Sequence, residues 1–373
     1  MQKLFYNTIK MYQPSFQITH NLLTYIASIE ASKALIDSAP LVPSWEAKFR
    51  DEALTRTVHF GTKIEGNDLS AEQASQVIHL KGDFDTKEIS EKTGVIARER
   101  DIQEVINYRN VLMWIDQQKI MGRKPEFTLE TLHTLHSLTM KGLLEEDSHI
   151  GGFRQKQVIV QGVGAGEVVF RPPVSVEVPF LISELFSWLN DPVNVHIHPI
   201  FKAAIVHYQL VYVHPYVEGN GRTARAFATL VLYLLGYDFK RFFSIEQYFD
   251  NDVDQYYKAL LSVQQKADSD MTFWMEYFCY GLAVEIDKVK HQVQKLSKDL
   301  KLKKELGKQV ALSERQIILL ELLQNQGQMT SDDAQRVLPN ISVDTILRDV
   351  RDLIKKGVVK KEGVTKGVHY SLM

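Results

Sequence analysis

The sequence predicts a mainly α-helical protein. Apolar residues recur at intervals of three and four over most of the 373 residues, as in 20–37 and 45–60, which is the spacing of one buried helix face. β-branched residues cluster in only two short segments, 158–173 and 357–372. With 45% apolar and 24% charged residues, the chain is long enough to bury a large core and to form two or three compact units.

The composition excludes several classes of protein. The 44 basic and 46 acidic residues give a formal net charge of −2, so no overall field attracts the chain to nucleic acid or to an anionic membrane. The single cysteine, Cys279, cannot form an intramolecular disulfide, which fits a reducing compartment. The longest apolar stretch, Phe227 to Leu235, is too short to cross a bilayer. We therefore expect a cytoplasmic protein without a membrane partner.

The segment Val158 to Pro173 predicts a β-hairpin inside the helical chain. Two β-branched runs flank a glycine-rich turn, and a double proline closes the second run. Near the C-terminus, two further strands are expected around Gly363. The only β structure that we expect is therefore one hairpin at each of these places.

The C-terminal residues, 311–373, are predicted to form a winged helix-turn-helix domain. A lysine-rich amphipathic pattern at 286–310 predicts a helical connector before it. Three short helical patterns then lead into the C-terminal strands, and this order is typical of a winged helix. The three patterns occupy residues 313–326, 331–338 and 342–356.

One segment combines the residue types of a nucleotide-binding site: HPYVEGNGRTAR, from His214 to Arg225. Pro215 ends an apolar helical pattern and a second pattern follows, so the glycines lie in a tight loop at a helix N-terminus. Free backbone N–H groups and the positive end of the helix dipole favour an anion there. Arg222 and Arg225, three residues apart, share one helix face and are able to bind phosphate oxygens.

Two further residues of this segment supply the groups that phosphoryl chemistry needs. Glu218 offers a hard carboxylate ligand for a hydrated Mg²⁺ ion that bridges phosphates. A neutral imidazole at His214 is able to take the proton of a hydroxyl that attacks phosphorus. The alternative, a helix-turn-helix corner capped by glycine and arginine, explains neither residue.

The segment resembles the signature of the Fic family, HPFx(D/E)GNGRxxR, with Tyr216 in place of phenylalanine. The resemblance implies a Fic/Fido helical core and transfer of AMP from the co-substrate ATP to a serine, threonine or tyrosine hydroxyl, with Mg²⁺ as cofactor. Gly221 stands where the phosphate-transferring members have lysine, which favours nucleotidyl transfer. The implied roles are general base for His214, metal ligand for Glu218, anion hole for Gly219, Asn220 and Gly221, and contacts to the β- and γ-phosphates for Arg222 and Arg225.

The resemblance covers residues 127–268, which we take as the catalytic core, and part of an N-terminal helical region, 1–120. The predicted hairpin looks like the family's flap, whose strand lines the site and holds the target by main-chain pairing. Tyr256 and Tyr257 look like the family's paired tyrosines beside the nucleoside, and ordinary core tyrosines are the alternative. The strand residues that would line the site are Val158, Ile159, Val160 and Gln161.

In the N-terminal region, TKIEGN, from Thr62 to Asn67, looks like the family's inhibitory motif, (S/T)xxxE(G/N). The resemblance implies that Glu65 pairs with Arg225 and takes the place of the γ-phosphate, so that the enzyme is autoinhibited. The sequence departs from the motif because Gly61 stands where the family has a hydroxyl residue. A plain surface helix end is the alternative interpretation.

Taken together, the motifs predict a protein adenylyltransferase whose partners are ATP and a protein with a hydroxyl side chain. A homodimer and DNA binding by the winged helix stay open, although the mixed charges of helix 342–356 bind phosphate backbones weakly. The alternative function is a transcriptional regulator whose core senses a nucleotide. Sequence-specific, salt-dependent DNA binding without turnover would distinguish it.

Overall fold

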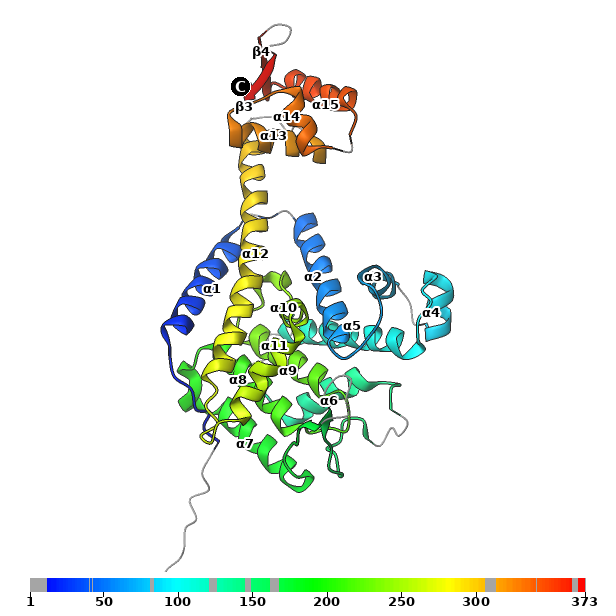
Figure 1. The fold of residues 1–373 in the computed structure, drawn as a ribbon, viewed down its shortest axis with the longest axis vertical. Helices are drawn as coiled ribbons and strands as arrows, with labels where there is room; N and C mark the ends of the chain where they lie inside the picture. Colours follow the sequence, from blue (N-terminus) through cyan, green and yellow to red (C-terminus); the bar gives the residue numbers. More distant parts are fainter. Residues whose placement is uncertain are drawn as a thin grey trace, which may run out of the picture. The chain divides into compact units, whose positions relative to one another are not determined.

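The protein is mainly α-helical, as predicted, and forms two compact units, Met1–His291 and Gln292–Met373 (Figure 1). No helix among the described residues is long and apolar enough to cross a membrane. The computed structural model describes residues 12–39, 41, 43–80, 84–120, 126–144, 149–161, 168–305, 313–339, 341–363 and 368–372.

A pair of helices that follow one another in the chain forms the centre of the first unit. These are α8 (Pro199–Val213) and α9 (Asn220–Leu234), and nearly every side chain of both is buried. Both sequences are mainly apolar, and their few polar side chains are mostly buried as well, as expected for helices enclosed on every side. The helices α5 (Glu99–Ile120) and α6 (Leu129–Met140) pack on α9, and α7 (Val178–Asn190) packs on α8.

The N-terminal helices belong to the same unit as this pair. Helix α2 (Pro43–Lys63) contacts α5, α9 and α10 (Ile245–Asn251), so the N-terminal region and the predicted core share one set of packed helices. The other helices of the region are α1 (His20–Ser38), α3 (Ala71–His79) and α4 (Thr86–Thr93).

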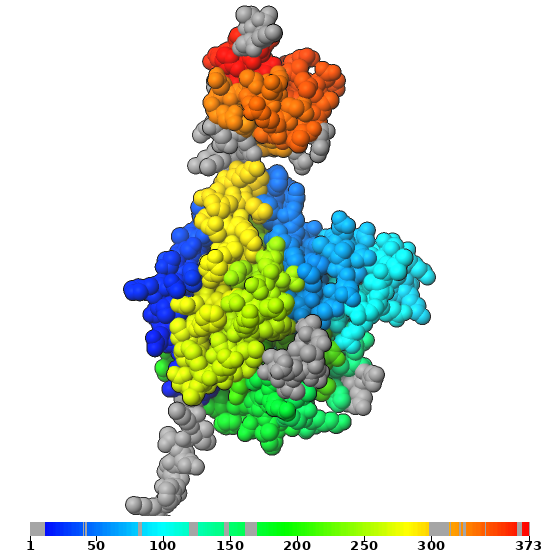
Figure 2. Space-filling view, viewed as in Figure 1, coloured from blue at the N-terminus to red at the C-terminus, as the bar shows by residue number. Residues whose placement is uncertain are grey.

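Helix α12 (Thr272–Glu305) begins earlier than the predicted connector, and its first turns pack on the first unit. The indole of Trp274 donates a hydrogen bond of 2.8 Å to the carbonyl of Ala204 in α8. Tyr277 and Tyr280 contact the ring of Tyr248 in α10. Figure 2 shows this part of α12, in yellow, at the surface beside α10 and α11 (Val253–Gln264).

The predicted hairpin is present but shorter than expected. Strand β1 (Val160–Gln161) pairs antiparallel with β2 (Val168–Phe170), and Val160 lies opposite Phe170. Val158 and Ile159 precede β1 and were wrongly included in the strand. The same register places Pro172 opposite Val158, and proline has no N–H to continue the ladder. The predicted turn, residues 162–167, lies outside the described residues.

After α12, the described residues of the second unit form three helices and a small sheet, an arrangement consistent with the predicted winged helix. Strand β5 lies between β3 and β4 in an antiparallel sheet. The prediction missed β3, because two residues are too few to show a strand pattern. The elements are α13 (Glu314–Gln326), β3 (Gln328–Met329), α14 (Ser331–Val337), α15 (Val343–Lys355), β4 (Val359–Glu362) and β5 (His369–Leu372).

Gly61 allows α2 and α5 to approach closely, so we predict that Gly61→Ala destabilises the first unit. A Cβ there would lie 3.1 Å from Tyr108 Cδ1 and closer still to Cε1. Overpacking costs about 1–3 kcal/mol, whereas alanine improves helix propensity by only about 1 kcal/mol. Urea unfolding should show a lower midpoint for this variant than for the parent. An unchanged midpoint would show that the ring moves aside at no cost.

Candidate functional site

The loop between α8 and α9 is held in an unusual backbone conformation. His214 ends α8 with φ +50° and ψ 62°, in the left-handed region that costs a non-glycine residue about 1–2 kcal/mol. Gly219 precedes α9 with φ +77°, where a side chain would collide with the sulfur of Met140. The Asn220 side chain closes the loop, since it accepts from Tyr216 N and donates to Tyr216 O, both at 2.9 Å.

Arg154 ties this loop to the base of the hairpin, and the sequence analysis did not identify it. Its buried guanidinium donates to the carbonyl of His214 at 2.7 Å. It also donates to the carbonyl of Lys156 at 3.2 Å and to that of Pro173 at 2.5 Å. Its backbone N–H donates to Pro215 O at 2.9 Å. These bonds offset the strain at His214 and fix both ends of the hairpin to the loop.

The His214 imidazole has a defined tautomer. Nδ1 lies 3.1 Å from the carbonyl of Val211, which only accepts, so the proton is on Nδ1 and the lone pair is on Nε2. Burial lowers the pKa of His214 below its ordinary value, although the bond to Val211 and the charge of Glu65 act in the opposite direction. The ring is therefore neutral at neutral pH and able to accept a proton on Nε2.

His136 of α6 supports the loop from the other side and was also missed by the sequence analysis. Gly151 N–H donates to its Nδ1 at 2.9 Å, so Nε2 carries the proton and donates to Glu218 O at 3.1 Å. The ring stacks on Tyr216 with centroids 3.6 Å apart. Burial lowers the pKa of His136 to about 3, so the imidazole stays neutral in this role.

Arg225 of α9 forms the ion pair with Glu65 that the sequence analysis expected. Nη2 of the buried arginine lies 2.8 Å from Glu65 Oε1 and donates to the carbonyl of Gly61 at 2.8 Å. Burial acts to raise the pKa of Glu65, but the charges of Arg225 and Arg222 outweigh it and lower the pKa. Both members of the pair are therefore ionised.

The segment predicted as an inhibitory motif departs from the pattern that it resembles, and the structure gives a steric reason for the departure. The residue at the hydroxyl position, Gly61, has no room for a side chain beside Tyr108, and contributes its carbonyl to Arg225 instead. The Thr62 hydroxyl bonds back to Val58 O and His59 O at 3.0 and 3.1 Å, within α2. The hydroxyl therefore plays no part in the ion pair.

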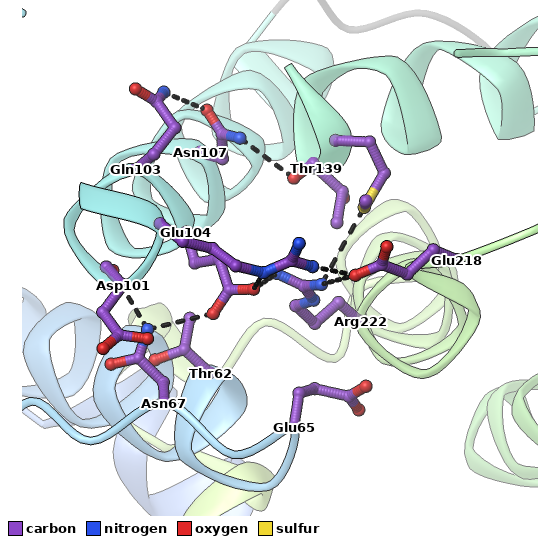
Figure 3. A network of polar contacts seen from close by, with 12 residues as sticks. Thr62, Glu65, Asn67, Asp101, Gln103, Glu104, Asn107, Thr139, Glu218 and Arg222 are labelled. Carbon is purple, nitrogen blue, oxygen red and sulfur yellow. Dashed lines mark hydrogen bonds and ion pairs between the residues drawn. The ribbon is translucent and has the colours of Figure 1, made fainter. Parts of the chain in front are cut away.

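The spacing of Arg222 and Arg225 predicted that both would bind phosphate from one helix face. In the structure, however, the two arginines have different partners. Nη1 of Arg222 lies 3.1 Å from Glu104 of α5, and its Nη2 lies 3.9 Å from Glu218. Glu104 also accepts from the Asn67 side chain at 3.0 Å. Figure 3 shows Glu104, Arg222 and Glu218 in one row of contacts, to which Glu65 does not belong. Arg222 is thus held by carboxylates away from the cavity described next.

A cavity of about 260 Å³ brings most of the predicted residues together. It does not reach Val158, Ile159 or Arg222. The phenol of Tyr256 is buried and lies 3.2 Å from His207 Nε2, whereas Tyr257 is partly exposed. The lining residues are Glu65, Val160, Phe170, Val211, His214, Val217, Glu218, Gly219, Asn220, Gly221, Arg225, Tyr256, Tyr257, Leu260, Leu261 and Gln264.

The donors of this cavity fit a metal-bound phosphate group. Glu218 is the carboxylate of the loop, and its side chain is 39% exposed, so an ion bound there keeps water and phosphate ligands, as Mg²⁺ prefers. The α9 N-terminus faces the same space with a positive dipole. Among the described residues, the buried Nε of Arg225 has no hydrogen-bond partner, which leaves a donor for an anion.

Comparison with known proteins places this geometry in a family. Residues 126–232 match the Fic/DOC family, and they include α6, α8, the loop with His214 and most of α9. This segment is a Fic/DOC domain. Within the Fic domain lie the predicted base, metal ligand and anion loop, while Glu65 and α5 come from outside it.

The relatives of the Fic domain include proteins named as adenylyltransferases. The protein adenylyltransferase Fic of Drosophila willistoni is 26% identical over 212 residues, 57% of this chain and 38% of that protein. The same enzyme of Drosophila virilis is 28% identical over 188 residues, 50% of this chain and 34% of that protein. The similarity therefore spans well under half the length of either relative.

Solved structures share the fold over a larger part of the chain. A Fic family protein from Desulfovibrio desulfuricans has a TM-score of 0.62 at 22% identity, over 97% of this chain and 98% of that chain. A Fic domain signalling protein from Bacteroides thetaiotaomicron has a TM-score of 0.57 at 19% identity, over 75% of this chain and 97% of that chain. At these identities, the similarities show a shared fold and nothing further.

The pKa of His214 provides a direct test of the site electrostatics. Because burial lowers it, the imidazole should titrate below its ordinary value of about 6.5. Glu65→Gly should lower the midpoint further, since it removes a carboxylate that stabilises the imidazolium. The Cε1–H resonance, assigned with His214→Ala, can be followed against pH. A parent midpoint above 6.5, or a rise in Glu65→Gly, would contradict the assigned environment.

Proposed function

We propose that the protein is an adenylyltransferase that moves AMP from ATP to a serine, threonine or tyrosine hydroxyl of a protein target or of itself. The observation that carries this proposal is the single cavity shared by His214 Nε2, the Glu218 carboxylate and the guanidinium of Arg225. A base, a metal ligand and a phosphate anchor around one space are the parts that phosphoryl chemistry requires. The adenylyltransferase names of the relatives support the same reaction.

In the proposed reaction, the target hydroxyl oxygen attacks the α-phosphorus of ATP. The new bond joins this oxygen to phosphorus, the bond from the α-phosphorus to the bridging oxygen breaks, and pyrophosphate leaves. The hydroxyl proton passes to Nε2 of His214, which the Val211 bond has left as the basic nitrogen. Magnesium, when bound at Glu218, would neutralise phosphate charge. The α9 N-terminus and Arg225 would hold phosphate oxygens.

The hairpin is the proposed docking place for the target. Val160 of β1 and Phe170 of β2 both line the cavity, so a segment paired with the hairpin would bring its side chains to His214. An exposed strand edge pairs through main-chain groups and does not require a particular sequence. This mode is compatible with more than one target protein and with self-modification.

In this proposal, the ion pair between Glu65 and Arg225 inhibits the parent enzyme. The guanidinium of Arg225 is already engaged when ATP arrives, and the γ-phosphate must displace a charged partner or bind elsewhere. A displaced γ-phosphate shifts the α-phosphorus relative to His214. Because in-line attack tolerates little misplacement, inhibition acts on the transfer step more than on nucleotide affinity.

The base assignment is tested by His214→Ala. We expect transfer to fall by about 10²- to 10⁴-fold, while nucleotide affinity stays near that of the parent, because proton transfer contributes to rate and not to ground-state binding. Labelled ATP measures transfer, and calorimetry measures binding. The control is His196→Ala, which removes an exposed histidine outside the cavity. Unchanged transfer in His214→Ala would reject this residue as the base.

The inhibition model predicts that Glu65→Gly raises transfer by about ten- to a hundredfold, because the α-phosphorus regains its alignment. The isosteric Glu65→Gln should also activate, since it removes the charge that holds Arg225. Glu72→Gln, which removes an exposed carboxylate of α3, should behave like the parent.

Arg225→Ala gives the second arm of this experiment. It should be inactive, both alone and combined with Glu65→Gly, because the freed site lacks its phosphate anchor. Transfer rates of the parent, both single variants and the double variant decide the matter. If Glu65→Gly were no faster than the parent, the ion pair would be structural and the autoinhibition model would be wrong.

A further inference from the structure

A second residue from outside the Fic domain occupies the nucleotide machinery. Nη2 of Arg100, in the first turns of α5, contacts Glu218 Oε1 directly (Figure 3 shows Glu218 in this network). Nε of the same guanidinium lies 3.3 Å from Glu104 Oε1. A cation from α5 therefore lies where the carboxylate of the loop would bind a metal ion.

The surroundings of Arg100 allow it to leave without unfolding the network. Its side chain is 46% exposed and that of Glu218 is 39% exposed, whereas Glu104 is 6% exposed. Glu104 keeps two other partners, the Arg222 guanidinium in an ion pair at 3.1 Å and the Asn67 amide in a hydrogen bond at 3.0 Å. Release of Arg100 therefore exposes no unpaired buried charge, and a long arginine side chain on a surface helix reaches solvent by rotamer changes alone.

A neighbouring arginine, Arg98, makes different contacts, which shows that the contact of Arg100 is specific. Arg98 directly precedes α5, and its guanidinium pairs with Asp101 at 2.7 Å and with Asp68 at 3.1 Å. It also donates to the carbonyl of Gly66 at 3.2 Å, and none of these contacts reaches the loop that carries Glu218. Arg98 is thus a reference for the general effect of removing an exposed cation at the start of α5.

We propose that Arg100 is a positioning residue that occupies the cation place at Glu218 and is displaced when magnesium binds. The proposal rests on the proposed function, which assigns magnesium to Glu218. The guanidinium of Arg100 contacts Oε1 of Glu218, so a metal ion that binds this carboxylate must displace the guanidinium or meet its positive charge, and the two cations compete. Arg100 raises the magnesium requirement of nucleotide binding, whereas Glu65 acts on the phosphate anchor. The N-terminal region therefore controls the site at two separate points.

The competition predicts a particular effect on nucleotide affinity. Kd for a non-transferable ATP analogue is measured in excess magnesium and in EDTA, and the ratio of the two gives the gain due to the metal. The full-length Arg100→Ala variant should show a gain about two- to sixfold larger than the parent, the range that an exposed ion pair supplies. Arg98→Ala should match the parent, and Arg100→Lys should retain most of the parent behaviour. High salt should narrow the difference, because exposed pairs are screened.

Three results of this experiment would contradict the competition between Arg100 and magnesium. Unchanged circular dichroism and Tm would show that Arg100→Ala is folded. If this variant and the parent then gave equal gains, the competition would be overturned and the proposed function would stay intact. Weaker analogue binding in both conditions would overturn it as well, because Arg100 would then be a phosphate ligand. A parent with no magnesium-dependent gain would contradict the metal site at Glu218, and with it both proposals.

Discussion

The ion pair between Glu65 and Arg225 is the contact on which the rest of the site depends. Arg225 is almost completely buried, and a buried charge without a partner costs several kcal/mol. Glu65 and the Gly61 carbonyl satisfy it, which requires the end of α2 to lie against the start of α9. Gly221 makes this approach possible, because a Cβ there would collide with Glu65, while Gly61 lets α2 lie close to Tyr108 of α5. The proposed phosphate would use the same guanidinium, so nucleotide binding and the ligand-free packing oppose one another.

The other charged groups of α9 and its loop are also paired with residues of the N-terminal region. Glu104 pairs with Arg222, and Arg100 contacts Glu218, so residues before the Fic domain neutralise three charged groups of α9 and its loop. The buried pairs, on Arg222 and Arg225, hold the N-terminal region as part of the first unit. The exposed pair, on Glu218, adds little to stability but lies where it can respond to a metal. Packing of the first unit and proposed control of the site thus rest on one set of contacts.

The parts of the structure that the sequence predicted are those with a local signal. The helices α8 and α9 and their loop follow from apolar spacing, Pro215 and the glycines, and the family resemblance linked Glu65 to Arg225. The direction of Arg222 could not be derived, because its partner Glu104 comes from a helix more than a hundred residues earlier. Arg154 and His136 were missed because each acts through bonds to backbone carbonyls, which no sequence motif specifies. Hairpin length was overestimated because Pro172 faces Val158 only once the register is known.

The most direct test of the account is the structure of the parent and of Glu65→Gly with magnesium and a non-transferable ATP analogue. In the parent, Arg225 should stay on Glu65 and the γ-phosphate should lie away from its guanidinium. In Glu65→Gly, the γ-phosphate should contact Arg225, and the α-phosphorus should lie in line with a hydroxyl position beside His214 Nε2. Identical phosphate positions in the two structures, with the γ-phosphate on Arg225 in both, would contradict the claim that Glu65 controls the phosphate anchor.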